Sequence, residues 1–267
     1  MPTLHTAHDA TEALTRRRLL RWLASVAGVA LAAPVLSGCS DTPEVIVTGG
    51  VSADRAAAYR DLVLAAIPLV EDLWGWRSVP TPVRIDLPLT LAQWAAATGY
   101  RPDQRGYAAS TVRSGQSEVR IVMHPDAWPD LSPQGRQAVI THEVTHLTMG
   151  PTDRAPWWIA EGLAEYTAHR RSTMSVAQIA GSALEQAAKA PGSSWPVPSS
   201  TGADAWQGYA RAWLACVYLA ERFDEEVLPS VCAAAAAGQP EDTWMPALLG
   251  ETSSDLHRAW MTWLGRQ

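Results

Sequence analysis

The sequence lacks several features that would place a protein in other classes. It carries 21 basic against 27 acidic side chains, and it has no basic stripe of the kind that nucleic-acid binders show. It has no internal repeat and no Cys-x-x-Cys pair, so a zinc site built on cysteines is not expected. Its most apolar run is too short for a membrane span. Any metal chemistry must therefore come from side chains other than cysteine.

The N-terminus has the parts of an export signal. Arg16, Arg17 and Arg18 precede a mostly apolar run over residues 22–35, which ends in Leu36-Ser37-Gly38-Cys39. A short apolar run between a basic start and small residues is typical of a removable signal. We therefore predict a signal peptide over residues 1–38. An ordinary N-terminal anchor helix is the alternative.

Two known bacterial signals resemble these segments. The twin arginines followed by Leu-Leu resemble the twin-arginine (Tat) export signal, although three arginines also suit Sec export. Leu-Ser-Gly-Cys resembles the lipobox of bacterial lipoproteins, which implies that Cys39 is lipidated and becomes the mature N-terminus. The resemblance implies an exported protein on the extracytoplasmic face of the cell membrane. Its lipid, not a basic patch, would hold it there.

Cleavage before Cys39 would leave residues 39–267, which are 229 residues and enough to bury a substantial core. We expect a tether over 39–51 and a single domain over 52–267. Loss of four arginines and two acidic residues leaves 17 basic and 25 acidic side chains, a net charge of about −8. Nucleic acid is not an expected partner, and the sequence carries no sign of the oligomeric state.

Cys216 and Cys232 remain after Cys39 is assigned to lipid. They form an even pair in an oxidising compartment, and both lie in segments with a helical pattern. A disulfide that clips a helical hairpin is one interpretation. Two buried free thiols are the other.

The hydrophobic pattern predicts an α+β chain that is mostly helical. Strands are expected over 83–87, 106–112 and 118–123, and helices over 53–74, 91–97, 132–149 and 157–169. Further helices are expected around 174–189, 203–222, 225–237, 241–249 and 252–265. A small antiparallel or mixed sheet should lie beside the helix over 132–149, with a helical C-terminal half after it. Ser132 and Pro133 suit the start of that helix.

A short motif on that helix indicates a metal site. His142-Glu143-Val144-Thr145-His146 has the form H-E-x-x-H. On a helix His142 and His146 lie one turn apart on the same face, where their imidazoles can hold one Zn²⁺. Glu143 sits beside them to handle the proton of a zinc-bound water. A catalytic zinc takes three protein ligands, so one more is needed.

Two carboxylates compete for the third position. Glu161 and Glu165 are four residues apart on one expected helix and therefore share a face. The spacing from His146 to Glu165 occurs in some zinc aminopeptidases. The context Trp158-Ile159-Ala160-Glu161-Gly162 favours Glu161, because a glycine beside it allows close helix packing.

These two segments together resemble the gluzincin metallopeptidases, in particular the small exported proteins of the peptidase MA-like group. The resemblance implies a zincin-like fold and one zinc per chain, held by His142, His146 and Glu161. It implies that Glu165 accepts the N–H of His142 and fixes its tautomer. The connection from His146 to Glu161 is shorter than in the larger gluzincins. Gluzincins often use a tyrosine or histidine as oxyanion donor. Tyr209 matches that tyrosine, or is a core tyrosine, and His257 is another candidate.

The expected function is that of a lipid-anchored zinc peptidase acting on a peptide or protein substrate. A zinc-activated water would attack the peptide bond with Glu143 as general base. In these folds the strand before the metal helix lines the cleft, which here is residues 118–123. A non-catalytic binding or assembly lipoprotein on the same scaffold is the alternative, and a structural zinc site is a third interpretation. The sequence does not separate an endopeptidase from an aminopeptidase.

Overall fold

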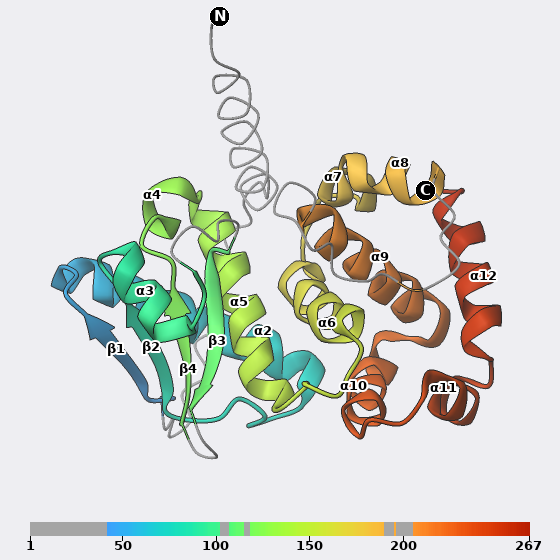
Figure 1. The fold of residues 1–267 in the computed structure, drawn as a ribbon, viewed down its shortest axis with the longest axis horizontal. Coiled ribbons are helices and arrows are strands. Elements are labelled where there is room, and N and C mark those ends of the chain that lie inside the picture. Colours follow the sequence, from blue (N-terminus) through green and yellow to red (C-terminus); the bar gives the residue numbers. More distant parts are fainter. Residues whose placement is uncertain (1–41, 102–106, 115–117, 190–194, 196–204) are drawn as a thin grey trace, which may run out of the picture.

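The structure is a computed structural model and describes residues 42–101, 107–114, 118–189, 195 and 205–267. Figure 1 shows a small sheet with helices packed against it on one side of the molecule and a group of helices on the other. The predicted signal over 1–38 and the predicted lipidation site at Cys39 lie outside the described residues. Within the described ranges, no helix combines the length and apolarity needed to cross a membrane.

The sheet has four strands in the order β1-β2-β4-β3. They are β1 (Val45–Gly49), β2 (Val83–Leu87), β3 (Ala109–Ser114) and β4 (Glu118–Met123). β2 is parallel to β1 and β4, while β3 is antiparallel to β4. The expected mixed α+β architecture with a small sheet is therefore confirmed.

Strand β1 corrects the predicted tether over 39–51. Val45 pairs with Val83, and Val47 pairs with Ile85. Val45 is buried, and the run of β-branched residues in β1 suits a strand that completes one side of the sheet. The tether prediction was wrong here because a five-residue strand at the end of a domain has little pattern of its own.

The helices follow the predicted order closely. In the first half they are α2 (Ala53–Trp74), α3 (Leu91–Thr98), α4 (Ala127–Asp130) and α5 (Pro133–Met149). Then come α6 (Trp157–His169), α7 (Val176–Ala180), α8 (Ser182–Lys189), α9 (Ala205–Phe223), η1 (Glu225–Val227), α10 (Leu228–Ala236), α11 (Glu241–Leu249) and α12 (Ser253–Leu264). The sequence did not predict α4. The helix expected over 174–189 is divided at Gly181, whose φ of 53° is costly for other residues.

Helix α5 has clear end signals. The Ser132 side chain accepts a hydrogen bond from the Gly135 N–H at 3.1 Å, and Pro133 occupies the first turn. At the other end, Gly150 has a φ of 72° and ends the helix. Both signals were read from the sequence, and they fix where the H-E-x-x-H motif lies along the helix.

The apolar core has two parts, which we call the sheet core and the helical core. The sheet core is formed by the strands with α2 and the inner face of α5. The helical core is formed by α6 and the helices that follow it. The Trp74 indole N–H of α2 donates to Thr167 Oγ1 of α6 at 3.1 Å. Arg170 bridges Asp72 of α2 and Glu225 of η1 at 2.8 and 2.7 Å. The two parts are therefore joined along α6.

The two cysteines are free thiols, so the disulfide interpretation is corrected. Cys216 on α9 and Cys232 on α10 are both buried. Cys216 packs against Gly162 of α6, where an added Cβ would lie 2.8 Å from its Sγ. Burial raises the pKa of both thiols, that of Cys232 to about 11. Cys216 is thus used to pack α9 against α6.

Candidate metal centre

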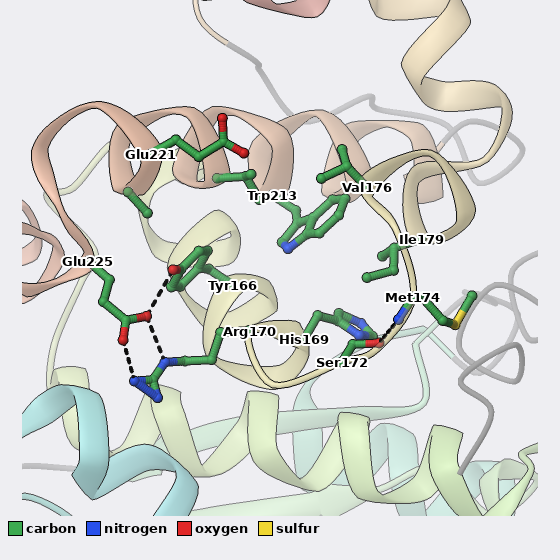
Figure 2. Close-up of a pocket in the computed structure, with 12 residues that line it drawn as sticks. Tyr166, His169, Arg170, Ser172, Met174, Val176, Ile179, Trp213, Glu221 and Glu225 are labelled. Carbon is green, nitrogen blue, oxygen red and sulfur yellow. Dashed lines mark hydrogen bonds and ion pairs between the residues drawn. The ribbon is translucent and has the colours of Figure 1, made fainter. Parts of the chain in front are cut away.

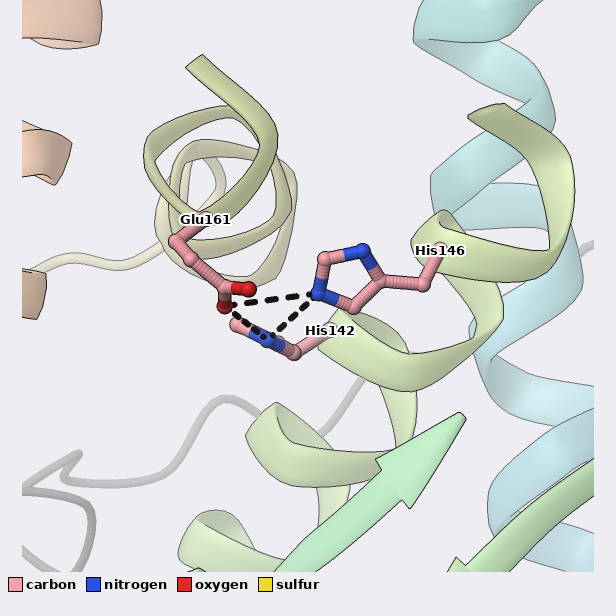
Figure 3. Close-up of side chains that lie close together, drawn as sticks. All are labelled: His142, His146 and Glu161. Atoms are coloured by element: carbon pink, nitrogen blue, oxygen red, sulfur yellow. Dashed lines mark hydrogen bonds and ion pairs between the residues drawn. The ribbon is translucent and has the colours of Figure 1, made fainter. Parts of the chain in front are cut away.

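Three side chains from two helices converge on one point. Figure 3 shows His142 and His146 extending from α5 toward Glu161 on α6. The two histidine Nε2 atoms lie 3.0 Å apart, and each lies 3.4 Å from Oε2 of Glu161. These described residues form a group that could hold a metal ion. The structure thus brings Glu161, rather than Glu165, to the two histidines.

The triad fits zinc in size and in donor type. Two ligands bound to a tetrahedral zinc at about 2.0–2.1 Å lie about 3.3 Å apart, which is close to the spacing of these atoms. Two imidazole nitrogens and one carboxylate oxygen are also common zinc donors. Lone pairs directed at one point repel each other unless a cation or a proton lies between them. The arrangement therefore suits a bound cation.

The charges around the triad favour a positive group at its centre. Burial alone would raise the pKa of Glu161, but the nearby rings of His146 and His142 hold it well below its usual range. Burial would lower the pKa of His142, but Glu161 and Glu165 together raise it well above 6.5. The two carboxylates therefore favour the protonated form of His142 when no metal is bound.

Glu165 lies behind His142, on the side away from Glu161. Its Oε1 lies 3.3 Å from Nδ1 of His142. Burial opposes ionisation, but the two neighbouring histidines, His142 and His169, lower the pKa of Glu165 to about 2. An ionised carboxylate at this distance favours a proton on Nδ1, which leaves the Nε2 lone pair of His142 for a metal.

Glu143 is buried beside the triad, with 5% of its surface exposed. Its Oε2 accepts a hydrogen bond from the Thr111 hydroxyl of β3 at 2.7 Å. This contact fixes the rotation of the carboxylate. Thr111 was missed by sequence reasoning, because nothing in a strand pattern says which strand will face a given helix.

A cavity of about 220 Å³ opens over the triad. Its walls include His142, Glu143 and Glu161, and also Tyr209 of α9 and Tyr107. The rings of Tyr209 and His142 lie 6.3 Å apart. Burial, and then the charge of Glu161, raise the pKa of Tyr209 well above its usual value. Tyr209 therefore keeps its proton at neutral pH and can donate a hydrogen bond into the cavity. His257 instead packs against Trp195 and Trp260 in the helical core.

The strand that lines this cavity is β3, not the predicted segment over 118–123. Ser110, Thr111 and Arg113 of β3 all contribute to the lining of the cavity. β4 pairs with β2 on one side and β3 on the other, so β3 is the terminal strand on this side of the described sheet. The prediction was wrong because chain order does not give the order of strands in a sheet.

Arg113 ties the terminal strand to the end of the metal helix. Its Nη2 donates to the carbonyl oxygens of His146 and Gly150, at 2.9 and 2.7 Å. The His146 carbonyl belongs to the last turn of α5 and the Gly150 carbonyl follows directly after it, where a cation is favourable. Arg113 was also missed from the sequence. Its contacts hold β3 in place beside the triad.

Comparisons of this chain with protein-family models, with curated proteins and with solved structures find no match.

Proposed function

We propose that this chain is a zinc-dependent peptidase of the gluzincin type, with a zincin-like fold. One observation carries the proposal. His142, His146 and Glu161 converge within 3.0–3.4 Å, and the buried carboxylate of Glu143 shares their cavity. Three protein donors leave a metal position open to water, and a carboxylate beside it can serve as general base. A purely structural zinc site would need neither an open coordination position nor a neighbouring carboxylate.

The protein residues can be given definite tasks in peptide hydrolysis. When bound, zinc would lower the pKa of a water molecule and polarise the scissile carbonyl. Glu143 would accept a proton from the attacking water and pass it to the leaving amine. Thr111 would hold the Glu143 carboxylate in place through its 2.7 Å hydrogen bond.

Tyr209 is our candidate for the group that stabilises the developing oxyanion. It lines the same cavity as Glu143 and the triad, and its raised pKa keeps the hydroxyl protonated. A preorganised donor in such a position typically contributes about 10²–10³-fold to the rate. Tyr209→Phe should therefore lower kcat within that range and leave zinc content unchanged.

The decisive experiment uses the purified mature protein and a broad peptide library analysed by mass spectrometry. Wild type should hold about one zinc per chain, as a three-ligand site implies, and should cleave peptides unless a chelator is present. Glu143→Gln should keep the zinc and lose about 10²–10⁴-fold in rate. Undiminished turnover in this variant would overturn the mechanism. Bound zinc in a wild type that cleaves nothing would favour the binding or assembly lipoprotein.

We also propose that the protein is exported and anchored by lipid, on the evidence of the N-terminal sequence. Cys39→Ala should release the protein from membranes into the soluble fraction. Replacing Arg16 and Arg17 by lysine should stop export through the twin-arginine route but leave Sec export intact. A Cys39→Ala protein that stays in the membrane fraction would contradict the anchor.

A further inference from the structure

His169 extends a row of polar side chains along one face of α6. Glu161, Glu165 and His169 are spaced four residues apart, so they follow one another at about one turn each. The side chains become more buried along the row, with 19%, 8% and 2% of their surface exposed. A histidine this deeply buried needs a polar neighbour.

The two oxygens of Glu165 each face a different histidine. Oε1 lies 3.3 Å from Nδ1 of His142, and Oε2 lies 3.4 Å from Nε2 of His169. Glu165 is itself buried, so its charge depends on these two neighbours. The two histidine rings therefore face the carboxylate from two sides, each within ion-pair distance of a different oxygen.

We propose that His169 is a positioning residue for the metal centre and acts through Glu165. Its Nε2–H holds Oε2 of Glu165, so that Oε1 stays directed at Nδ1 of His142. His142 then keeps its proton on Nδ1 and presents the Nε2 lone pair to the metal. The inference rests on the metal site of the proposed function, but it does not depend on peptide hydrolysis.

The surroundings of His169 allow this idea to be tested by substitution. Figure 2 shows its ring at the wall of a second cavity, of about 330 Å³, which is also lined by Trp213 and Ile179. The rings of His169 and Trp213 are 6.3 Å apart in an edge-on arrangement. This space can accept side chains of similar size in place of the imidazole.

The test compares three substitutions of His169 that differ in whether the new side chain has an N–H donor and whether that donor can reach Glu165. His169→Gln places an amide N–H near the position of Nε2, whereas the amide of His169→Asn is too short to reach Glu165. His169→Phe keeps a ring without a donor. Loss of such an outer partner typically weakens metal binding by 10–100-fold. We expect at least about a tenfold loss for Phe and Asn, and a change of no more than about threefold for Gln.

The measurement is the zinc dissociation constant, obtained by competition with a chromophoric chelator, with circular dichroism of the metal-free protein as a check on folding. His257→Gln is the matched control and should bind zinc as wild type does, because His257 packs against Trp195 and Trp260 and does not line the cavity over the triad. In a Glu165→Ala background the His169 substitutions should cause no further loss of zinc affinity, because His169 acts on the metal centre only through Glu165.

The possible failures can be told apart. A wild type that binds no zinc would overturn both the proposed function and this inference. Wild-type binding together with unchanged affinity in His169→Phe and His169→Asn would overturn the inference alone. So would a loss in His169→Gln as large as in His169→Phe, or a full additional loss in the Glu165→Ala background.

Discussion

The sheet core with its helices (the sheet half) and the helical core (the helical half) hold their parts of the candidate metal centre differently. α5, on the sheet core, supplies both histidines from one five-residue motif, and its two buried threonines are satisfied within the helix. The hydroxyls of Thr141 and Thr145 donate to the carbonyls of Gln137 and Thr141, four residues earlier. The geometry of the two histidines is therefore set within one helix.

On the helical core, the place of Glu161 depends on packing between helices. The next residue, Gly162, lies so close to α9 that an added Cβ would be 2.4 Å from the Ala212 carbonyl oxygen. Trp158, Ile159 and Leu163 of the same helix are buried in the helical core. The comparison shows that the two histidines are placed by a local helical motif, whereas Glu161 is placed by packing between helices. Each half can be disturbed separately.

Removing the proposed ligand on α6 should have the largest effect. Glu161→Ala leaves two histidines and should weaken zinc binding by more than about 100-fold, which exceeds the range for outer partners. Glu165→Gln should cost about 10–100-fold, because it disturbs only the orientation of His142. Zinc dissociation constants check this order. The reverse order would mean that Glu165 is the ligand.

The proton that Glu161 and Glu165 favour on His142 should make zinc binding depend on pH. Burial lowers the pKa of His142, but Glu161 and Glu165 raise it well above 6.5, so zinc must displace a proton near neutral pH. Zinc affinity should rise about tenfold per pH unit until the raised pKa is passed. Titrations of the metal-free protein at several pH values measure the slope, and a flat profile would contradict it.

The same proton should affect the stability of the metal-free fold. Because the folded pKa of His142 is raised, its contribution is fully present below the unfolded value of about 6.5. The contribution is lost as pH rises through the folded pKa. Thermal unfolding without metal should therefore show lower stability on the alkaline side, and His142→Gln should remove this part of the pH dependence.

Crowding the contact between α6 and α9 should disturb the helical half more moderately. Gly162→Ala forces a backbone shift and should lower the free energy of unfolding by about 1–3 kcal/mol. Zinc affinity should also fall, because Glu161 is the neighbouring residue. Gly265→Ala is the control, since its nearest atoms lie at 3.7 Å or more. Urea unfolding measures the free energy of unfolding of both variants. Equal values for Gly162→Ala and Gly265→Ala would mean that α6 and α9 accommodate the added methyl group.

The smallest expected effect concerns the two cysteines of the helical half. A disulfide between Cys216 and Cys232 would contribute roughly 3 kcal/mol. Free thiols predict that a reductant leaves the melting temperature unchanged. In a Cys39→Ala protein, two thiols should react with a thiol reagent only after unfolding, because both are buried. A lower melting temperature with reductant would restore the disulfide interpretation.

Much of the secondary structure followed from local signals. Ser132, Pro133 and Gly150 set the ends of α5, and the pattern of apolar residues gave α6 and β2 nearly to the residue. β1 was missed because a short strand is recognised by its partner as much as by its own residues. Thr111 and Arg113 were missed for a related reason, since their roles depend on β3 being the terminal strand. The spacing of Glu161, Glu165 and His169 could have identified His169.

By itself the sequence determined the two histidines and the glutamate between them, because residues one turn apart on a helix share a face whatever surrounds it. It also narrowed the third ligand to two carboxylates on one helix. The sequence context favoured Glu161, and the tertiary structure places Glu161, not Glu165, with the two histidine Nε2 atoms. α6 packs beside α5 at a height and rotation that bring Oε2 of Glu161 to 3.4 Å from both Nε2 atoms and leave Glu165 behind His142. Interhelical packing sets that height and rotation, and it involves side chains far apart in the chain.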